Sequence, residues 1–283
     1  MSGVAPAPSV RDDVLSYFHF FPGRGIIIAA LVLFSLATVL CLAATIVTGR
    51  WYMLIAVAVG IMELIGYAFR LTMLTKPVYG YYVGMQCLLI IPPSFLALVE
   101  YMTLAKVVQA VRDRNPGVKF FLRPKLITWL YFTAEIVSLA LQGAGAGLSV
   151  SQDGVNKNQS VGRALLIVGL VFLVVVIICF LLNAVFVSVT KEYGVWQSRN
   201  LTYLFVVLYF TTTLLLIRNL FRLIEFAGGW YGRLAVQEKY FYTLDALMVL
   251  LILFTFSFAH YGFFLRAYMK EMDRKAPAQI AMV

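Results

Sequence analysis

Long apolar stretches separated by short polar segments dominate the chain. A helix needs roughly 20 apolar residues to cross about 30 Å of hydrocarbon. The pattern predicts seven transmembrane helices, near 25–48, 51–74, 82–110, 123–149, 161–188, 201–222 and 242–266. The predicted fold class is therefore an all-α membrane protein with seven transmembrane helices.

The polar segments divide the chain into three parts. Residues 1–24 are expected to form a short flexible arm, residues 25–266 the seven-helix domain, and residues 267–283 a short basic tail. The first apolar stretch is longer than the apolar region of a signal peptide, so we expect it to be retained as a helix.

Composition supports a protein that lies in a bilayer. Of 283 residues, 62% are apolar and 13% are charged, and the mean hydropathy is +0.88; these values lie outside the range of soluble domains. The net charge of +10 therefore bears on orientation rather than on nucleic acid, which is not an expected partner. Cys41, Cys87 and Cys179 each fall inside an apolar stretch, which predicts small core residues rather than a disulfide or a metal site.

The basic residues predict the orientation, since cytoplasmic loops of membrane proteins are enriched in Lys and Arg. With the N-terminus outside, thirteen basic residues fall inside: Arg50, Lys106, Arg112, Arg114, Lys119, Arg123, Lys125, Lys191, Arg199, Arg266, Lys270, Arg274 and Lys275. Seven fall outside: Arg11, Arg24, Lys76, Lys157, Arg163, Arg233 and Lys239. We therefore expect the N-terminus outside and the C-terminus in the cytoplasm.

A glycosylation sequon agrees with this orientation. Asn158-Gln159-Ser160 follows the fourth predicted helix, on the side predicted to be outside, so Asn158 is a candidate glycosylation site. Asn200-Leu201-Thr202 also matches the sequon, but it falls on the inner side and is expected to stay unmodified.

Charged residues gather where the last two predicted helices approach the loop between them. Arg218, Arg222 and Glu225 fall at i, i+4 and i+7, on one helical face. The spacing recurs in Glu238, Tyr242 and Asp245. The pattern predicts two helix ends joined by charge around a polar pocket; the alternative is that these charges only tie the two helices together.

The second predicted helix carries charges within the membrane. Glu63, Gly66, Tyr67 and Arg70 share one face. A charge in mid-membrane costs on the order of 3 kcal/mol on insertion scales, so this face should point away from lipid. Two interpretations stay open: a Glu63–Arg70 link that holds the bundle together, and a face turned toward a substrate. Gly66 should let a neighbouring helix approach closely.

The third and fourth predicted helices contain breakers, acids and small residues. Pro92-Pro93 must interrupt the third helix and free backbone carbonyls, and Glu100 and Glu135 are further acids in apolar surroundings. The glycine series from Gly143 to Gly147 predicts close helix packing, and Gln142 lies level with the polar pocket, where it can supply a hydrogen bond. Seven polar residues share the predicted outer half and indicate a charged vestibule: Arg70, Gln142, Arg218, Arg222, Glu225, Glu238 and Asp245.

Five motifs in fixed order carry a family resemblance. They are Glu63-x-x-Gly66-Tyr67-x-x-Arg70, the Pro92 region ending in Tyr101-Met102-x-Leu104, Gln142-Gly143-x-Gly145, Arg218-x-x-x-Arg222-x-x-Glu225, and Glu238-x-x-x-Tyr242-x-x-Asp245. From about residue 26 to 266 the chain resembles the fungal seven-helix lipid-translocating exporter family, which includes a sphingoid long-chain-base exporter and aminocholesterol-resistance proteins. It departs from the family in Glu100, where a small neutral residue is expected, and in a tail of only 17 residues after Arg266.

The resemblance implies a protein of the plasma membrane, or of an endomembrane, that moves amphipathic lipids and gives resistance to toxic ones. The candidate substrate-binding residues are Glu63, Arg70, Gln142, Arg218, Arg222, Glu225, Glu238, Tyr242 and Asp245. A cationic amine could meet Glu225, Glu238 or Asp245. Membrane lipids are the expected partners, and the oligomeric state is left open.

Two other functions are considered against the same residues: a receptor and an enzyme. Seven helices with the N-terminus outside fit a receptor or sensor of lipid stress equally well. An enzyme is disfavoured because no metal-binding histidine pair and no nucleophile elbow occur, and the two histidines, His19 and His260, fall on opposite sides. We therefore expect no catalytic residue, no metal and no cofactor.

Overall fold

The computed structural model describes residues 15, 18, 22–114, 124–150, 156–228 and 238–280. Within these ranges the regular elements are helices and no strand occurs. The main helices are α2 (Arg24–Thr48), α3 (Leu54–Met73), α4 (Tyr79–Ile90), α5 (Pro92–Arg114), α6 (Pro124–Val150), α7 (Asn156–Val189), α8 (Arg199–Gly228), α9 (Glu238–Phe241), α10 (Leu247–Phe258) and α11 (Tyr261–Ile280). A π-helix, η4 (Tyr242–Ala246), joins α9 to α10, and short 3₁₀ helices lie at Trp51–Met53, Lys191–Tyr193 and Val195–Gln197.

Seven helical stretches of the described chain are long and apolar enough to cross a membrane. Five of them are single helices, or a helix with its leading 3₁₀ turn. The other two are composite: Tyr79–Asp113 contains α4 and α5, and Glu238–Arg274 contains α9, η4, α10 and part of α11. The predicted all-α membrane fold with seven spans is confirmed, while the orientation of the termini stays a prediction.

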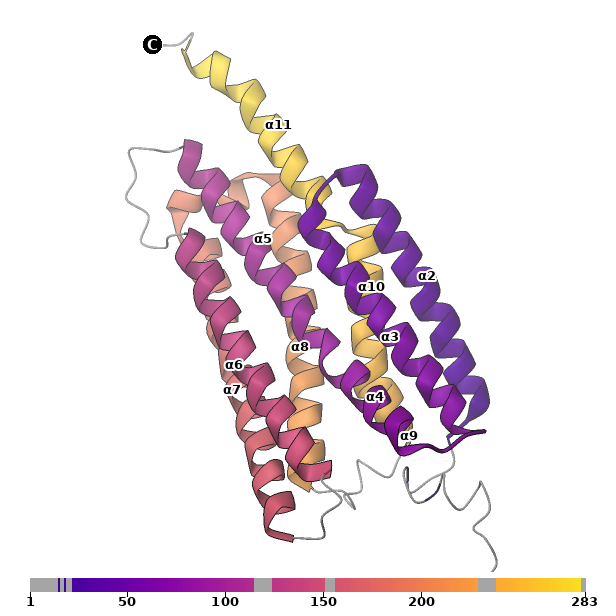
Figure 1. Cartoon of the computed structure of the whole chain (residues 1–283). Coiled ribbons are helices and arrows are strands. Elements are labelled where there is room, and N and C mark those ends of the chain that lie inside the picture. The colour runs from indigo at the N-terminus through magenta and orange to yellow at the C-terminus, as the bar shows by residue number, and fades with distance from the viewer. Residues whose placement is uncertain are drawn as a thin grey trace, which may run out of the picture.

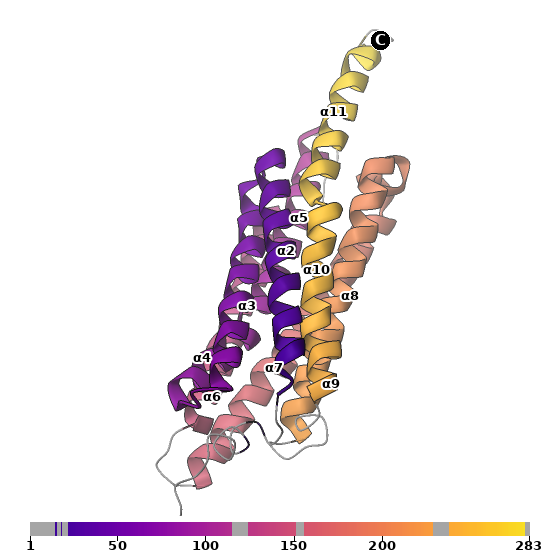
Figure 2. The ribbon, with the colours of Figure 1, turned by 90° about the vertical axis from the view of Figure 1, so that its right-hand side faces the viewer.

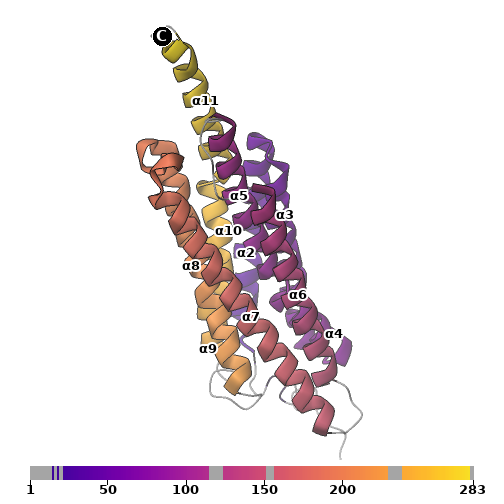
Figure 3. The same ribbon diagram turned by 90° about the vertical axis from the view of Figure 1, so that its left-hand side faces the viewer.

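The helices form one elongated bundle (Figure 1). The pair α2 and α3 lies on one side, the pair α6 and α7 on the other, and α5, α8 and α10 run between them. Views from the two sides show α2 and α10 in front on one face (Figure 2) and α6 and α7 in front on the opposite face (Figure 3). We call the end at which α2 begins and α8 ends the α9 end, and the opposite end the α11 end.

Glycines set the closest helix contacts. A Cβ atom on Gly66 of α3 would lie 2.7 Å from the Leu89 side chain of α4, so the predicted close approach at Gly66 is confirmed. On Gly145 of α6 it would lie 2.5 Å from the backbone nitrogen of Leu166 in α7. Within the glycine series of α6, Gly145 therefore serves helix packing, whereas a Cβ on Gly143 would meet nothing within 4 Å.

Apolar side chains cover much of the outside. On α7, Val171, Val175 and Leu182 are exposed, while Leu170 and Phe180 are buried. The aliphatic sequence of this helix predicts that such a face meets lipid or a partner subunit, and the exposed set is open to either. The cysteines correct one expectation: all three are free, and only Cys41 is buried, while Cys87 and Cys179 are exposed. An apolar stretch in a membrane has a lipid face as well as a core face, so it does not by itself place a residue in the core.

The helix boundaries differ most from the predicted ones in the last two spans. α8 continues to Gly228, six residues past the predicted end, and carries Glu225 within it. The last span is interrupted at Ala259 and His260, and its second part, α11, continues to Ile280 through most of the predicted tail. Three predicted features lie outside the described residues: most of the arm (1–24), residues 115–123 between α5 and α6, and the side chain of Asn158.

Candidate functional site

An ion-pair network joins α8 to η4. The Asp245 carboxylate accepts hydrogen bonds from Arg218 Nε at 2.8 Å and from Arg222 Nε at 2.9 Å, and its second oxygen accepts from Arg222 Nη2. Arg222 Nη1 also donates to Glu225 Oε2 at 2.9 Å. The pairing that the i, i+4, i+7 spacing indicated is therefore present, and both oxygens of Asp245 are occupied by arginine.

The local backbone explains why Asp245 reaches both arginines. It lies in η4, a five-residue stretch of π-helix in which Tyr242, Asp245 and Ala246 are buried. A π-helical turn is wider than an α-helical one and is frequent at functional sites. Nothing in the local residue types distinguishes this turn from an α-helix, so the sequence predicts a regular helix here.

Arg218 also satisfies the break between α4 and α5. Pro92 and Pro93 have no N–H to donate to carbonyls one turn earlier, and the Ser94 N–H bonds to the carbonyl of Ile91 at 3.1 Å. Arg218 Nη2 donates instead to the carbonyls of Leu89 at 3.0 Å and Ile90 at 3.1 Å. The carbonyls freed by the break are thus bonded to a buried guanidinium.

Arg70 lies at the same end of the bundle with different surroundings. Its guanidinium carbon lies 4.5 Å from the Phe241 ring centroid, 5.2 Å from that of Phe18 and 5.4 Å from that of Tyr242. Its Nη2 lies 3.8 Å from Glu238 Oε1, which is longer than a hydrogen bond. Arg70 Nε and Nη2 are both buried without a hydrogen-bond partner.

Glu238 ties the start of α2 to the start of α9. Both of its carboxylate oxygens accept from the backbone N–H of Gly23, at 3.1 and 3.2 Å. Gly23 is the N-cap residue of α2, where free N–H groups favour an acidic partner. The charge of Glu238 therefore stabilises a helix end as well as lying beside Arg70.

Glu63 is buried on α3. Among the described residues it does not pair with Arg70, because the ion pair of Arg70 is with Glu238. Seven residues of helix separate the two by about 10 Å along the axis, so a direct link within the helix is out of reach. Glu63 instead interacts electrostatically with Asp245, Arg218 and Arg222. The interpretation of a Glu63–Arg70 link is therefore wrong: Arg70 pairs with Glu238 instead.

Gln142 belongs to another interface. Its Nε2 donates to Ser138 Oγ at 2.9 Å, and Ser138 Oγ donates to the carbonyl of Gly169 in α7 at 2.8 Å. Gln142 thus bonds within α6 and not at the pocket, and Ser138 continues the chain of hydrogen bonds to α7. Depth along a helix could be read from the sequence, but which neighbour a face meets could not.

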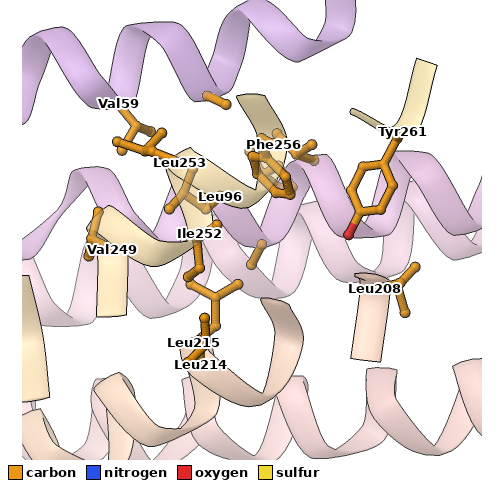
Figure 4. Close-up of a cluster of buried hydrophobic side chains, with 14 of the residues drawn as sticks. Val59, Leu96, Leu208, Leu214, Leu215, Val249, Ile252, Leu253, Phe256 and Tyr261 are labelled. Atoms are coloured by element: carbon orange, nitrogen blue, oxygen red, sulfur yellow. The ribbon is translucent and has the colours of Figure 1, made fainter. Parts of the chain in front are cut away.

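Apolar side chains close the interior beside the ion-pair network. Leu214 and Leu215 of α8 meet Ile252 and Leu253 of α10, with Leu96 of α5 completing the layer (Figure 4). We call these five residues, together with Val59, the apolar layer. Its members are all buried and belong to one hydrophobic core.

A second polar cluster lies beyond the apolar layer, toward the α11 end. The Tyr261 hydroxyl donates to Glu100 Oε2 at 2.7 Å and lies 2.9 Å from Thr211 Oγ1. On α6, Glu135 Oε2 accepts from Tyr101 at 3.3 Å. The acids were visible in the sequence; the hydroxyl partners were missed, although Thr211 precedes Arg218 by seven residues, on the same helical face.

The acids at the α9 end differ in accessibility. The Asp245 side chain is 4% exposed, whereas those of Glu225 and Glu238 are 14% and 23% exposed. The site can therefore offer Glu225 and Glu238 to a head group, beside Arg70 with its surrounding aromatic rings. No group of metal-ligating side chains occurs among the described residues.

Comparisons with known proteins identify a family and several relatives. A family model described as RTA1 like protein matches residues 56–268. Protoporphyrin uptake protein 1 of Saccharomyces cerevisiae is 27% identical over 202 residues, covering 70% of this chain and 64% of its own length. Protein RTM1 of Saccharomyces cerevisiae is 27% identical over 202 residues, covering 69% and 63%. The sphingoid long-chain base transporter RSB1 of Saccharomyces cerevisiae is 26% identical over 253 residues, covering 75% and 65%.

The matches span a little under two thirds of the length of these relatives. No solved structure is similar to the chain. The family match covers most of the seven-helix domain, from within α3 into α11, and includes every residue of the ion-pair network. The chain is therefore a multi-pass membrane protein that belongs to the RTA1-like protein family.

Proposed function

We propose that the protein transports amphipathic lipids, sphingoid long-chain bases above all, across the membrane that holds it, and that this transport gives resistance to them. It acts as a transporter and not as an enzyme, in the plasma membrane, with the α9 end outside. The name of one relative, a sphingoid long-chain base transporter, supports the substrate class. That of another, a protoporphyrin uptake protein, supports transport of amphipathic compounds more broadly.

One observation carries the proposal: two accessible acids lie at the α9 end, close to a buried polar network that borders the apolar layer. A long-chain base has a cationic amine and a hydrocarbon tail. Glu225 and Glu238, with side chains 14% and 23% exposed, can accept hydrogen bonds from the amine. Asp245 is not given this role because its side chain is 4% exposed and both its oxygens accept from arginine. Glu225 and Glu238 also accept hydrogen bonds, from Arg222 and from the Gly23 N–H, but their greater exposure leaves oxygen lone pairs open to a ligand.

The test is the release of a labelled long-chain base and of a labelled neutral phospholipid from cells with and without the protein. We expect faster release of the base alone, and a clear reduction in the double variant Glu225→Gln, Glu238→Gln. Glu192→Gln is the matched control, since Glu192 is an exposed acid at the α11 end. Unchanged release of both lipids, with the protein at the cell surface, would contradict transport and favour a sensor of lipid stress.

The orientation has its own test at Asn158. With the α9 end outside, wild-type protein expressed in a eukaryotic cell should lose apparent mass on deglycosylation, and Asn158→Gln should not. A glycan at Asn200 instead would reverse the proposed orientation, because α8 begins at the opposite end of the bundle.

A further inference from the structure

We propose that Arg70 is a binding residue for the anionic head group of an amphiphile, a carboxylate or a phosphate. The inference rests on the proposed function only in placing an amphiphile at the α9 end. It adds an anion site beside the acids already described. It can be tested by equilibrium binding alone, so it can fail or hold independently of transport.

The unpartnered atoms of Arg70 form one geometric unit. Nε and Nη2 lie on the same edge of the guanidinium, and their N–H bonds point in parallel toward one side. Such an edge matches the two oxygens of a carboxylate or a phosphate and binds them through two parallel hydrogen bonds. Arg70 is 3% exposed, and both nitrogens are buried without a hydrogen-bond partner.

In Arg222 the corresponding Nε and Nη2 edge is bonded to a carboxylate. Its Nε and Nη2 donate to the two oxygens of Asp245. In Arg218, Nε donates to Asp245 and Nη2 to two backbone carbonyls. These two and Arg70 are the fully buried arginines of the described chain. Because buried polar groups are nearly always hydrogen-bonded, the open edge of Arg70 needs an explanation, and a ligand supplies one.

Aromatic rings hold the guanidinium in place without using its N–H groups. Phe18, Phe241 and Tyr242 surround it at 4.5 to 5.4 Å from ring centroid to guanidinium carbon. Cation–π contact of this kind keeps the cation oriented, and the ring faces are suitable neighbours for the hydrocarbon next to a head group. The Tyr242 hydroxyl is buried beside Arg70 and interacts with it, but it makes no hydrogen bond of good geometry and can therefore turn to a ligand bound at Arg70.

Glu238 is the obvious competitor for Arg70, but it is engaged elsewhere. Its oxygens accept from the Gly23 N–H, and the nearer one is 3.8 Å from Arg70 Nη2. At that distance Glu238 offsets part of the charge of Arg70 without filling the edge. Arg70 is therefore able to bind an oxyanion, and the nearby charge of Glu238 lowers its affinity for that anion.

The experiment uses the purified full chain in detergent micelles and three tail-labelled probes of equal chain length: a fatty acid, a lysophosphatidic acid and a fatty alcohol. We expect the acids to bind roughly tenfold or more tightly than the alcohol, from charge-assisted hydrogen bonds. Arg70→Gln should lose this preference, and Arg70→Lys should keep only part of it because an ammonium has no edge. Arg199→Gln, at an exposed arginine of the α11 end, should leave it unchanged.

The two anionic probes separate the two sources of the chemistry. A preference for the fatty acid alone identifies a carboxylate ligand, and a preference for the lysophosphatidic acid alone identifies a phosphate. Equal binding of all three probes to the wild type, or an unchanged preference in Arg70→Gln, would overturn the proposal.

Glu238→Gln keeps the proposal testable if Arg70→Gln fails to fold. Removing the carboxylate charge near Arg70 should raise the affinity for both anionic probes and leave that for the alcohol unchanged. If Arg70 serves only as the counter-ion of Glu238, this variant gains no anion affinity, which would also overturn the proposal.

Discussion

Arg222 and Arg70 are both buried arginines at the α9 end, yet they are bonded in opposite ways. Arg222 donates to Asp245 through its Nε and Nη2 edge and to Glu225 through Nη1. Arg70 contacts three aromatic rings, and the same edge has no hydrogen-bond partner. The difference separates two roles that look alike in the sequence: a charge whose bonds are internal stabilises the bundle, and a charge with an open edge is available to a ligand.

The ion-pair network accordingly works as a clamp. Through Arg218 it joins α8, η4 and the break between α4 and α5. Arg218, Arg222 and Asp245 each bond to a second helix, so loss of one of them leaves buried charges or carbonyls unpaired. This is the situation in which buried ion pairs matter most, since removal of one partner is far costlier than the net gain from the pair.

The largest expected effect follows from Asp245→Ala. It leaves Arg218 and Arg222 buried without their shared carboxylate, which should cost about 3 to 5 kcal/mol of unfolding free energy. Thermal unfolding in detergent, monitored by size-exclusion chromatography, measures this loss of stability. Asp113→Ala is the control, as Asp113 is exposed on α5. Equal melting of the two variants would show that the network is not a clamp.

Arg218→Lys should have the next largest effect. The lysine keeps the positive charge but cannot reach Asp245 and two carbonyls of the broken helix together, so we expect a loss of about 2 kcal/mol from unsatisfied buried groups. Faster amide exchange in residues 86–94 would locate the damage at the break. Unaltered exchange there would mean that Arg218 does not hold the α4 and α5 junction.

Gly145→Ala tests whether α6 and α7, which the ion-pair network does not join, depend on close packing instead. Its Cβ would meet the backbone of α7 at 2.5 Å, whereas a Cβ on Gly143 meets nothing within 4 Å. Overpacking should cost about 1 to 3 kcal/mol in Gly145→Ala. Gly143→Ala should be neutral or slightly stabilising, because alanine favours the helix. Similar melting temperatures would indicate that α6 and α7 can separate at little cost.

Arg70→Gln should have the smallest effect on stability. No hydrogen bond from its Nε and Nη2 edge is lost, and the ring contacts and the 3.8 Å approach to Glu238 should together contribute about 1 kcal/mol. The variant should therefore melt close to the wild type in the absence of ligand. Severe destabilisation would place Arg70 with the clamp and not with a binding site.

The sequence predicted most of the fold and part of the site. The length of each apolar stretch predicts the seven spans, Pro92-Pro93 predicts the break, and the spacing of Arg218, Arg222 and Asp245 predicts their pairing. These features are local: they depend on helix length, backbone donors and the face of a single helix.

The rest depends on which helices are neighbours, and a single sequence does not contain that information. Arg70 meets Glu238 and not Glu63 because α9 and the start of α2 lie beside it. Gln142 faces α7 and not the ion-pair network. The π-helical turn that carries Asp245 likewise depends on its surroundings, since nothing in the local residue types distinguishes it from a regular helix.

The most direct test of the contrast is thermal unfolding of wild type, Arg222→Gln and Arg70→Gln, each with and without the tail-labelled fatty acid. A ligand that binds only the folded state raises the melting temperature. We predict that Arg222→Gln melts well below the wild type, and that Arg70→Gln melts near it but no longer rises with the fatty acid. An Arg70→Gln variant that melts as low as Arg222→Gln, or that keeps the full rise with the fatty acid, would contradict the account.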